Sequence, residues 1–287
     1  MPNLAPVLDQ EEYIEQAYFF HSFRQRQLEG QASQEVLTRI HEELLSTTRL
    51  PMAVQFMATE LKHTGMLSSA VARLPHYFTP FQAFILGKSE EEGLKFSTDT
   101  ALTILEHEAH YRSKQPTQQG LFVYQFETLC RNRLGYDHGL DAMMLDGFYD
   151  AAWREYLEVV RRNIGEIEFA DLVFIRSEVY AREHRARESA ITLPSILFGE
   201  KEGKIARANR GRDPLYLFAA LQRHLNYPLV PYLRHQDNPL SQLPTILAKL
   251  RELEQRIKYL ENESRERIRS SVNSLEGIKP ISLDDEN

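Results

Sequence analysis

The chain has 287 residues, 42% of them hydrophobic and 26% charged, with a formal net charge of −7 at pH 7. This is the balance of an ordinary globular protein, and the acidic charge argues against a general nucleic-acid coat, which needs a basic excess. The single cysteine, Cys130, excludes an intrachain disulfide and a cysteine-rich metal cluster.

Residues 1–181 are predicted to form an all-α, multi-helix body, because apolar residues recur there at helical spacing between cap and stop signals. Asp9 with Glu12 reads as a capping box, and Thr79-Pro80 reads as a cap followed by a first-turn proline. Helices are expected from 9 to 30, from 33, from 51 to 65, from 80, and over 99–111, 121–134, 150–163 and 169–184.

Two breaks interrupt this body. The polar stretch 115–120 contains a proline and a glycine and is the best candidate for a subdomain boundary. Residues 135–139, with a glycine at each end, are interpreted as a turn. A strand near 172–175 is an alternative to the last helix of the body, whose length favours the helix.

The character of the chain changes at Arg182. Residues 182–212 are rich in charge and glycine and are predicted to be an extended basic segment, followed by a helix over 213–226. A proline-rich linker then leads to residue 239. The final segments are expected to be an amphipathic helix over 240–277 and a disordered acidic tail over 278–287.

The C-terminal helix carries a short heptad seam, in which Leu243, Leu250 and Ile257 alternate with a second apolar row at three-four spacing. This spacing indicates either a parallel coiled coil with a second chain or a helix that docks on its own body. The charge pairs Lys249–Glu254 and Arg256–Glu261 favour self-association. The oligomerisation residues are predicted to be Ile246, Leu250, Leu253, Ile257 and Leu260.

A metal centre is one hypothesis for the body. Glu60 and His63 have the Glu-x-x-His spacing by which helical bundles hold di-iron or di-manganese centres, and Glu106 and His110 could join them. A second Glu-x-x-His motif is missing. Because Leu102, Leu105 and Ala109 form the apolar face of the helix over 99–111, its polar residues around Glu106, including Glu108, are expected to form a solvated face. No metal and no other cofactor is predicted.

The basic segment is the other candidate site. Its anion-binding residues would be Lys204, Arg207, Arg210 and Arg212, next to the N-terminus of the helix that begins at Pro214. A phosphate, a nucleic acid or an acidic protein would suit them, and a solvated loop paired with carboxylates is the alternative.

The sequence contains no nucleophile, dinucleotide or P-loop motif, and Cys130 lies in a helical run where a buried thiol acts as a small hydrophobe. The apolar stretch 66–86 is interrupted by charges and prolines, and the start has no signal-peptide pattern, so a soluble, cytoplasmic protein is expected. The leading hypothesis is a non-catalytic oligomeric interaction or scaffold protein. The alternatives are a metal-dependent helical-bundle oxidoreductase and a nucleic-acid or phosphate-binding module.

Overall fold

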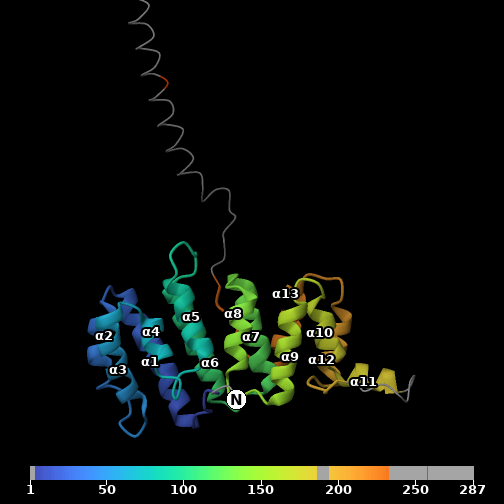
Figure 1. Ribbon diagram of the computed structural model, residues 1–287, viewed down its shortest axis with the longest axis horizontal. Coiled ribbons are helices and arrows are strands. Elements are labelled where there is room, and N and C mark those ends of the chain that lie inside the picture. Colours follow the sequence, from blue (N-terminus) through green and yellow to red (C-terminus); the bar gives the residue numbers. More distant parts are fainter. Residues whose placement is uncertain (1–3, 186–193, 233–256, 258–287) are drawn as a thin grey trace, which may run out of the picture. The chain divides into compact units, whose positions relative to one another are not determined.

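The computed structural model describes residues 4–185, 194–232 and 257. Figure 1 shows the helices in chain order. Within the described residues there are thirteen α-helices: α1 (Gln10–Leu28), α2 (Ser33–Ile40), α3 (Leu50–Thr64), α4 (Leu67–Ala72), α5 (Pro80–Glu90), α6 (Thr98–Arg112), α7 (Gln118–Asn132), α8 (Tyr136–Met144), α9 (Ala151–Asn163), α10 (Phe169–Ile175), α11 (Glu178–Arg185), α12 (Glu200–Ala208) and α13 (Pro214–Leu225). β pairing in the same residues is limited to isolated bridges, so the all-α prediction is confirmed for the described part of the chain.

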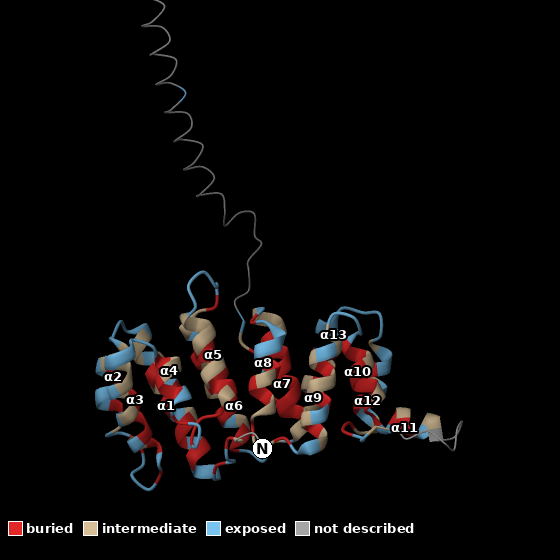
Figure 2. Cartoon of the chain, in the orientation of Figure 1, coloured by how far each residue is buried: buried red, intermediate tan, exposed pale blue. Residues whose placement is uncertain are grey.

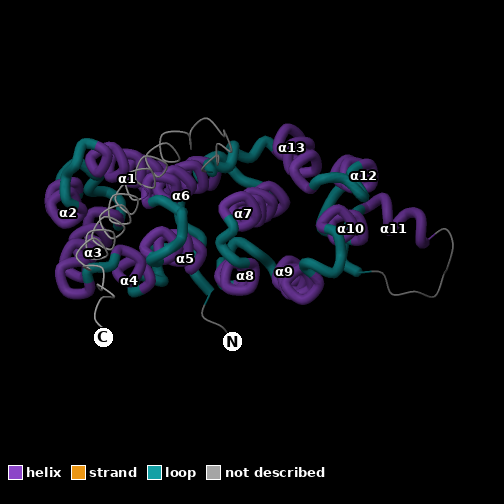
Figure 3. Tube along the Cα trace, turned by 90° about the horizontal axis from the view of Figure 1, so that it is seen from above, coloured by secondary structure: helices purple, strands orange, loops and turns teal. Residues whose placement is uncertain are grey.

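The described residues up to Tyr232 belong to the first of the two units into which the chain divides. Within the first unit, α1, α6, α7 and α13 lie in one row, and α3, α4, α5, α8 and α9 lie in a facing row (Figure 3). The polar stretch at 115–120 lies inside this unit, and one hydrophobic core cluster includes residues on both sides of it. The tail helix and the acidic tail expected after residue 239 lie outside the described residues, apart from Ile257.

The core lies between the facing helices. Buried residues concentrate on the sides that the helices turn toward each other, and exposed residues lie on the outer sides (Figure 2). Phe122 on α7 is fully buried. Its ring lies 5.3–6.2 Å from the rings of Phe126, Trp153, Tyr156, Phe169 and Phe198, measured between centroids. It therefore joins α7, α9 and α10 to the segment that precedes α12.

Helix caps follow the local sequence in most places. Thr79 caps α5 and Pro80 lies in its first turn, as predicted, and Gln82 completes a capping box that was not predicted. The Asp150 carboxylate accepts a hydrogen bond from the Trp153 amide at the start of α9. The predicted box at Asp9 is wrong, because the Asp9 side chain makes no cap hydrogen bond. Glu12 instead points into the core, where its carboxylate accepts hydrogen bonds from the Arg49 amide and the Tyr77 hydroxyl.

The turn predicted at 135–139 is wrong beyond its first residue. Gly135 has φ 86°, a left-handed conformation that suits glycine, but α8 begins at Tyr136 and includes Gly139. A Cβ atom on Gly139 would lie 2.5 Å from the Leu129 side chain. The second glycine therefore serves the close approach of α8 to α7, which the sequence pattern alone does not reveal.

The single helix predicted over 169–184 is also wrong, because the chain forms α10 and α11 with a break at Arg176 and Ser177. The Arg176 carbonyl accepts hydrogen bonds from the amides of Leu197 and Phe198, and the Glu178 amide donates to the Phe198 carbonyl. A distant segment thus satisfies the backbone groups that would otherwise continue the helix. The strand considered near 172–175 is helical, as part of α10.

The extended basic segment predicted over 182–212 is wrong for Glu200–Ala208, which forms helix α12. Ala206 is fully buried, and a Cβ atom on Gly203 would lie 2.4 Å from the Ser177 hydroxyl oxygen. Gly203 therefore permits close packing, so glycine content was misleading here. The helix predicted over 213–226 is confirmed as α13.

An ionic cluster lies inside the body, at the end of α6. Glu108 and Arg112 are buried, and the Arg112 guanidinium is ion-paired with both Glu108 and Asp146. One Glu108 oxygen accepts hydrogen bonds from Arg112 Nε (2.8 Å) and Gln125 Nε2 (3.2 Å), and its other oxygen, Oε2, has no partner in the described part of the chain. Burial raises the pKa of Glu108 despite the neighbouring Arg112.

The raised pKa of Glu108 predicts a stability that falls as pH rises. The folded state holds the proton of the Glu108 carboxyl group more tightly than the unfolded state does. The contribution of this group to the free energy of unfolding is therefore complete at low pH and is lost as pH rises through the pKa of the folded state. Glu108→Gln removes this titration, and its free energy of unfolding should fall less than that of the wild type as pH rises above 4.5, the ordinary pKa of glutamate. Urea denaturation of both proteins across this range measures the difference. Parallel curves would contradict the assignment.

No helix in the described residues is long and apolar enough to cross a membrane.

Candidate functional site

The four residues of the metal hypothesis lie on two different surfaces. Glu60 on α3 is ion-paired with Arg73, and His63 lines a pocket between α2 and α3. Glu106 and His110 instead line a groove between α1 and α6. In the described part of the chain, no group of three or more His, Cys, Asp or Glu side chains is arranged to hold a metal ion. The structure therefore does not assemble the helical-bundle centre that the spacing allowed.

The basic residues of the anion hypothesis are largely paired with carboxylates. Lys204 Nζ lies 2.6 Å from Glu200, Arg210 Nε lies 2.5 Å from Asp171, and Arg207 is ion-paired with Glu183. Hydrogen bonds from Lys204 and Arg182 lower the pKa of Glu200 to about 2.

The start of α13, which was expected to attract an anion beside Arg212, is occupied as well. The Asp213 carboxylate accepts a hydrogen bond from the Leu215 amide at 2.9 Å, so a side chain of the protein already caps the helix. These pairs match the alternative in which the segment is a solvated, charge-paired surface.

The predicted seam residues Ile246, Leu250, Leu253 and Leu260 lie outside the described residues. Ile257 is described, and its side chain is 55% exposed.

A surface groove of about 440 Å³ lies between α1 and α6. The two helices run antiparallel, since Arg24 near the end of α1 binds Asp99 at the start of α6, whereas Gln10 at the start of α1 binds the Ser113 carbonyl after α6. The groove is lined by Ile14, Ala17, Tyr18, His21, Glu106, His107 and His110.

One wall of the α1–α6 groove is apolar and unusually open. Ile14 and Tyr18 are 48% and 44% exposed, respectively, although they lie on a helix whose opposite face is fully packed. Together with Ala17 they form a stripe at i, i+3 and i+4, the spacing at which one helix presents a continuous surface to another.

The other wall is polar, and its carboxylate is already satisfied. Glu106 binds His21 Nδ1 at 3.0 Å and Arg24 Nη1 at 3.2 Å. His107 Nδ1 lies 3.1 Å from the Leu229 carbonyl, which brings the segment after α13 to the edge of the groove. His110 is exposed at the other end. The imidazoles of His107 and His110 are therefore the polar groups that a bound partner would meet.

The groove combines a residue pair that the sequence singled out, Glu106 and His110, with residues on α1 that it did not. His21 and Arg24 reach Glu106 across more than eighty positions of the chain. The signal available in the sequence was the apolar spacing of Ile14, Ala17 and Tyr18, of which Ile14 and Tyr18 lie exposed in the structure. The solvated face expected around Glu106 is wrong for Glu108, which is fully buried.

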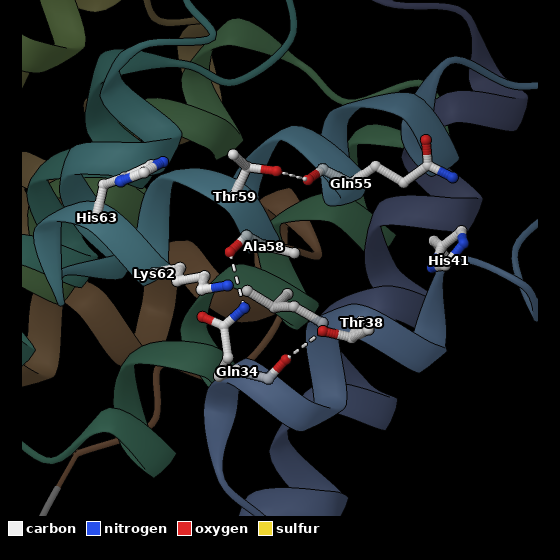
Figure 4. Close-up of a pocket in the computed structure, with 9 residues that line it drawn as sticks. Gln34, Thr38, His41, Gln55, Ala58, Thr59, Lys62 and His63 are labelled. Carbon is white, nitrogen blue, oxygen red and sulfur yellow. Dashed lines mark hydrogen bonds between the residues drawn. The ribbon is translucent and has the colours of Figure 1, made fainter.

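A second pocket, of about 530 Å³, lies between α2 and α3 (Figure 4). Lys62 and Gln34 extend toward each other across it, and His41 and His63 lie at opposite ends (Figure 4). The Thr38 and Thr59 hydroxyls donate to carbonyls of their own helices, and Gln34 Nε2 donates to the Ala58 carbonyl. Most of the residues that line this pocket are polar, whereas Ile14, Ala17 and Tyr18 form one wall of the α1–α6 groove.

Comparison of the chain with protein-family models, with curated proteins and with solved structures finds no match.

Proposed function

We propose that this protein is a non-catalytic interaction protein that binds an acidic amphipathic helix of a partner protein in the α1–α6 groove. The observation that carries this proposal is the exposed apolar stripe of Ile14, Ala17 and Tyr18 facing a row of imidazoles. Grooves between two helices commonly take a third helix through residues at i, i+3 and i+4.

Charge supports an acidic partner. Among the residues that line the groove the carboxylate is that of Glu106, which is paired with Arg24 and His21. Glu43, which accepts a hydrogen bond from the Tyr18 hydroxyl at 3.5 Å, is ion-paired with Arg26. A carboxylate on the docked helix would accept hydrogen bonds from His107 or His110. A basic partner would meet these imidazoles without a free carboxylate to balance it.

The groove can be tested by photocrosslinking in the cells that produce the protein. Tyr18→p-benzoylphenylalanine places the crosslinker in the groove, and we expect it to capture a segment that is both amphipathic and acidic. Adding Ile14→Lys should lower the yield at least about fivefold, because docking would bury an unpaired ammonium group. Mass spectrometry of the crosslinked peptides gives the captured sequence and the yield.

The matched control is Met52→p-benzoylphenylalanine, since Met52 is 75% exposed and lies outside the groove. The same peptides captured from Met52 would contradict a specific groove. So would crosslinks from Tyr18 to residues 240–277 of this chain, because its own tail would then be the occupant.

The heptad spacing of the tail supports an oligomeric form of this function. Ile246, Leu250, Leu253, Ile257 and Leu260 form a narrow apolar stripe in sequence, which a second copy can cover. At about 25 cal/mol per Å² of apolar surface, such a seam supplies several kcal/mol before association entropy is subtracted. We therefore propose a parallel dimer that presents two grooves, in the cytoplasm.

The dimer predicts a change of mass on disruption of the seam. Leu253→Lys together with Leu260→Lys would place unpaired cations in the seam, and the mass in solution should fall from two chains to one while the body stays helical. Light scattering after size-exclusion chromatography and circular dichroism measure the two properties. A wild type that is monomeric at tens of micromolar would contradict the dimer and leave the groove proposal standing.

The two alternative functions receive less support. The metal-dependent oxidoreductase lacks an assembled ligand set among the described residues, and the basic residues of the phosphate-binding module are largely paired with carboxylates.

A further inference from the structure

A separate pocket of about 210 Å³ lies where the residues before α1 cross the end of α6. Its lining includes the apolar side chains of Leu8, Tyr13 and Phe148, with Val7 at its exposed edge. Four polar residues complete it: Gln10, Arg112, Ser113 and Gln115. The Tyr13 hydroxyl accepts a hydrogen bond from the Leu8 amide at 3.1 Å, which fixes the N-terminal segment over the pocket. A cavity of 150 Å³ lined by apolar side chains is large enough for benzene, so this pocket suits a ligand of that size.

The charged group of this pocket is the buried Arg112 guanidinium. Its central carbon lies 5.8 Å from the Tyr13 ring centroid and 5.9 Å from the Phe148 ring centroid. Nε and Nη2 bind Glu108 and Asp146. Nη1 makes no hydrogen bond to the described residues. The Arg112 side chain is only 1% exposed, but Arg112 lines the pocket, so Nη1 is the nitrogen whose N–H groups a molecule there would meet.

The charges around Arg112 select a neutral ligand. Asp146 and Glu108 both face the guanidinium, so the cluster has no excess positive charge. An anion would add a further negative charge to a buried site that already contains two carboxyl groups. A carbonyl or hydroxyl oxygen accepts a hydrogen bond from Nη1 without that repulsion.

The rim of the pocket contains a strained residue. Gln115 has φ 55°, in the left-handed region that residues other than glycine seldom adopt, and it lies beside Pro116 at the mouth. Such strain tends to accumulate at binding sites. The neighbouring backbone is fixed, because Gln10 Nε2 donates a hydrogen bond to the Ser113 carbonyl at 2.8 Å.

We propose that this pocket binds a small neutral molecule with an apolar body, which packs on Tyr13 and Phe148, and one carbonyl or hydroxyl oxygen, which accepts a hydrogen bond from Arg112. This inference is independent of the α1–α6 groove, because Tyr13, Arg112 and Phe148 do not line that groove.

Three probes of one size test the proposal on the full chain. Benzamide offers a ring and a neutral acceptor, benzoate a ring and an anion, and toluene a ring alone. We expect benzamide to bind about tenfold more tightly than either of the others, with the dissociation constants measured by NMR titration of the labelled protein. Equal affinity for all three, tightest binding of benzoate, or no binding of benzamide at its solubility limit would overturn the proposal.

Replacing Arg112 itself would disturb the core, so the pocket is closed from its rim instead. Val7→Trp should fill the mouth and weaken benzamide binding at least about tenfold. The control is Leu28→Trp, at another exposed apolar position near the far end of α1, which should leave the affinity unchanged. Binding of benzamide that Val7→Trp leaves unchanged, or that Leu28→Trp weakens equally, would place it elsewhere and contradict the assignment.

Discussion

Arg112→Met should lower the free energy of unfolding by about 3–5 kcal/mol, the cost of breaking a buried ion pair by removing one partner. Methionine retains much of the aliphatic length but leaves Asp146 and Glu108 buried without their cation. Both carboxyl groups are at most 1% exposed, so without the guanidinium they would be left buried with little contact with water. Urea denaturation, with the slope held common to both proteins, measures the loss.

The matched control is Arg39→Met. Arg39 is also paired with a glutamate four residues away, Glu35 at 3.0 Å, but its side chain is 73% exposed. Exposed pairs of this kind contribute about 0.3–0.5 kcal/mol. A loss below about 1 kcal/mol for Arg112→Met would mean that the cluster does not hold α6 to Asp146.

Phe122→Ala as a single substitution should lower the free energy of unfolding by about 3–5 kcal/mol, as expected for removal of a fully buried aromatic ring. The Phe122 ring is in contact with aromatic rings from α9, from α10 and from the segment before α12. Its loss would leave a cavity that rigid helices on several sides cannot close. Thermal and urea unfolding followed by circular dichroism measure the change.

Tyr216→Ala provides the comparison for Phe122→Ala. Tyr216 is an aromatic residue on α13, but it is 67% exposed, and substitutions at such positions usually stay within about 0.5 kcal/mol. Similar losses for the two variants would contradict the assignment of Phe122 to the centre of the core.

The helical elements could be read from the sequence because their signals are local. Caps such as Thr79 and Asp150 satisfy backbone groups within a few residues of themselves. Apolar residues at helical spacing likewise mark the face that must leave water, whatever it packs against. The all-α class follows from these signals alone.

Glycine was read less reliably because its meaning depends on the partner. Gly135 marks a turn through its own φ angle. Gly139 and Gly203 lie within helices, and each admits a side chain from another element, Leu129 and Ser177 respectively. A glycine needed for a left-handed φ angle and a glycine needed for a close helix contact are the same letter in the sequence. Only the packed structure distinguishes the two.

The sequence by itself determined that this protein is helical, and it drew attention to Glu106 and His110. Only the tertiary structure decided that Glu106 pairs with Arg24 and His21 in a groove, while Glu108, two residues away, is buried with Arg112. The surroundings of two neighbouring carboxylates on one helix differ because the helix turns them toward different sides. They differ also because the facing elements offer different side chains. Local spacing specifies that rotation, but the partner comes from distant parts of the chain, and the charge of a buried group depends on that partner.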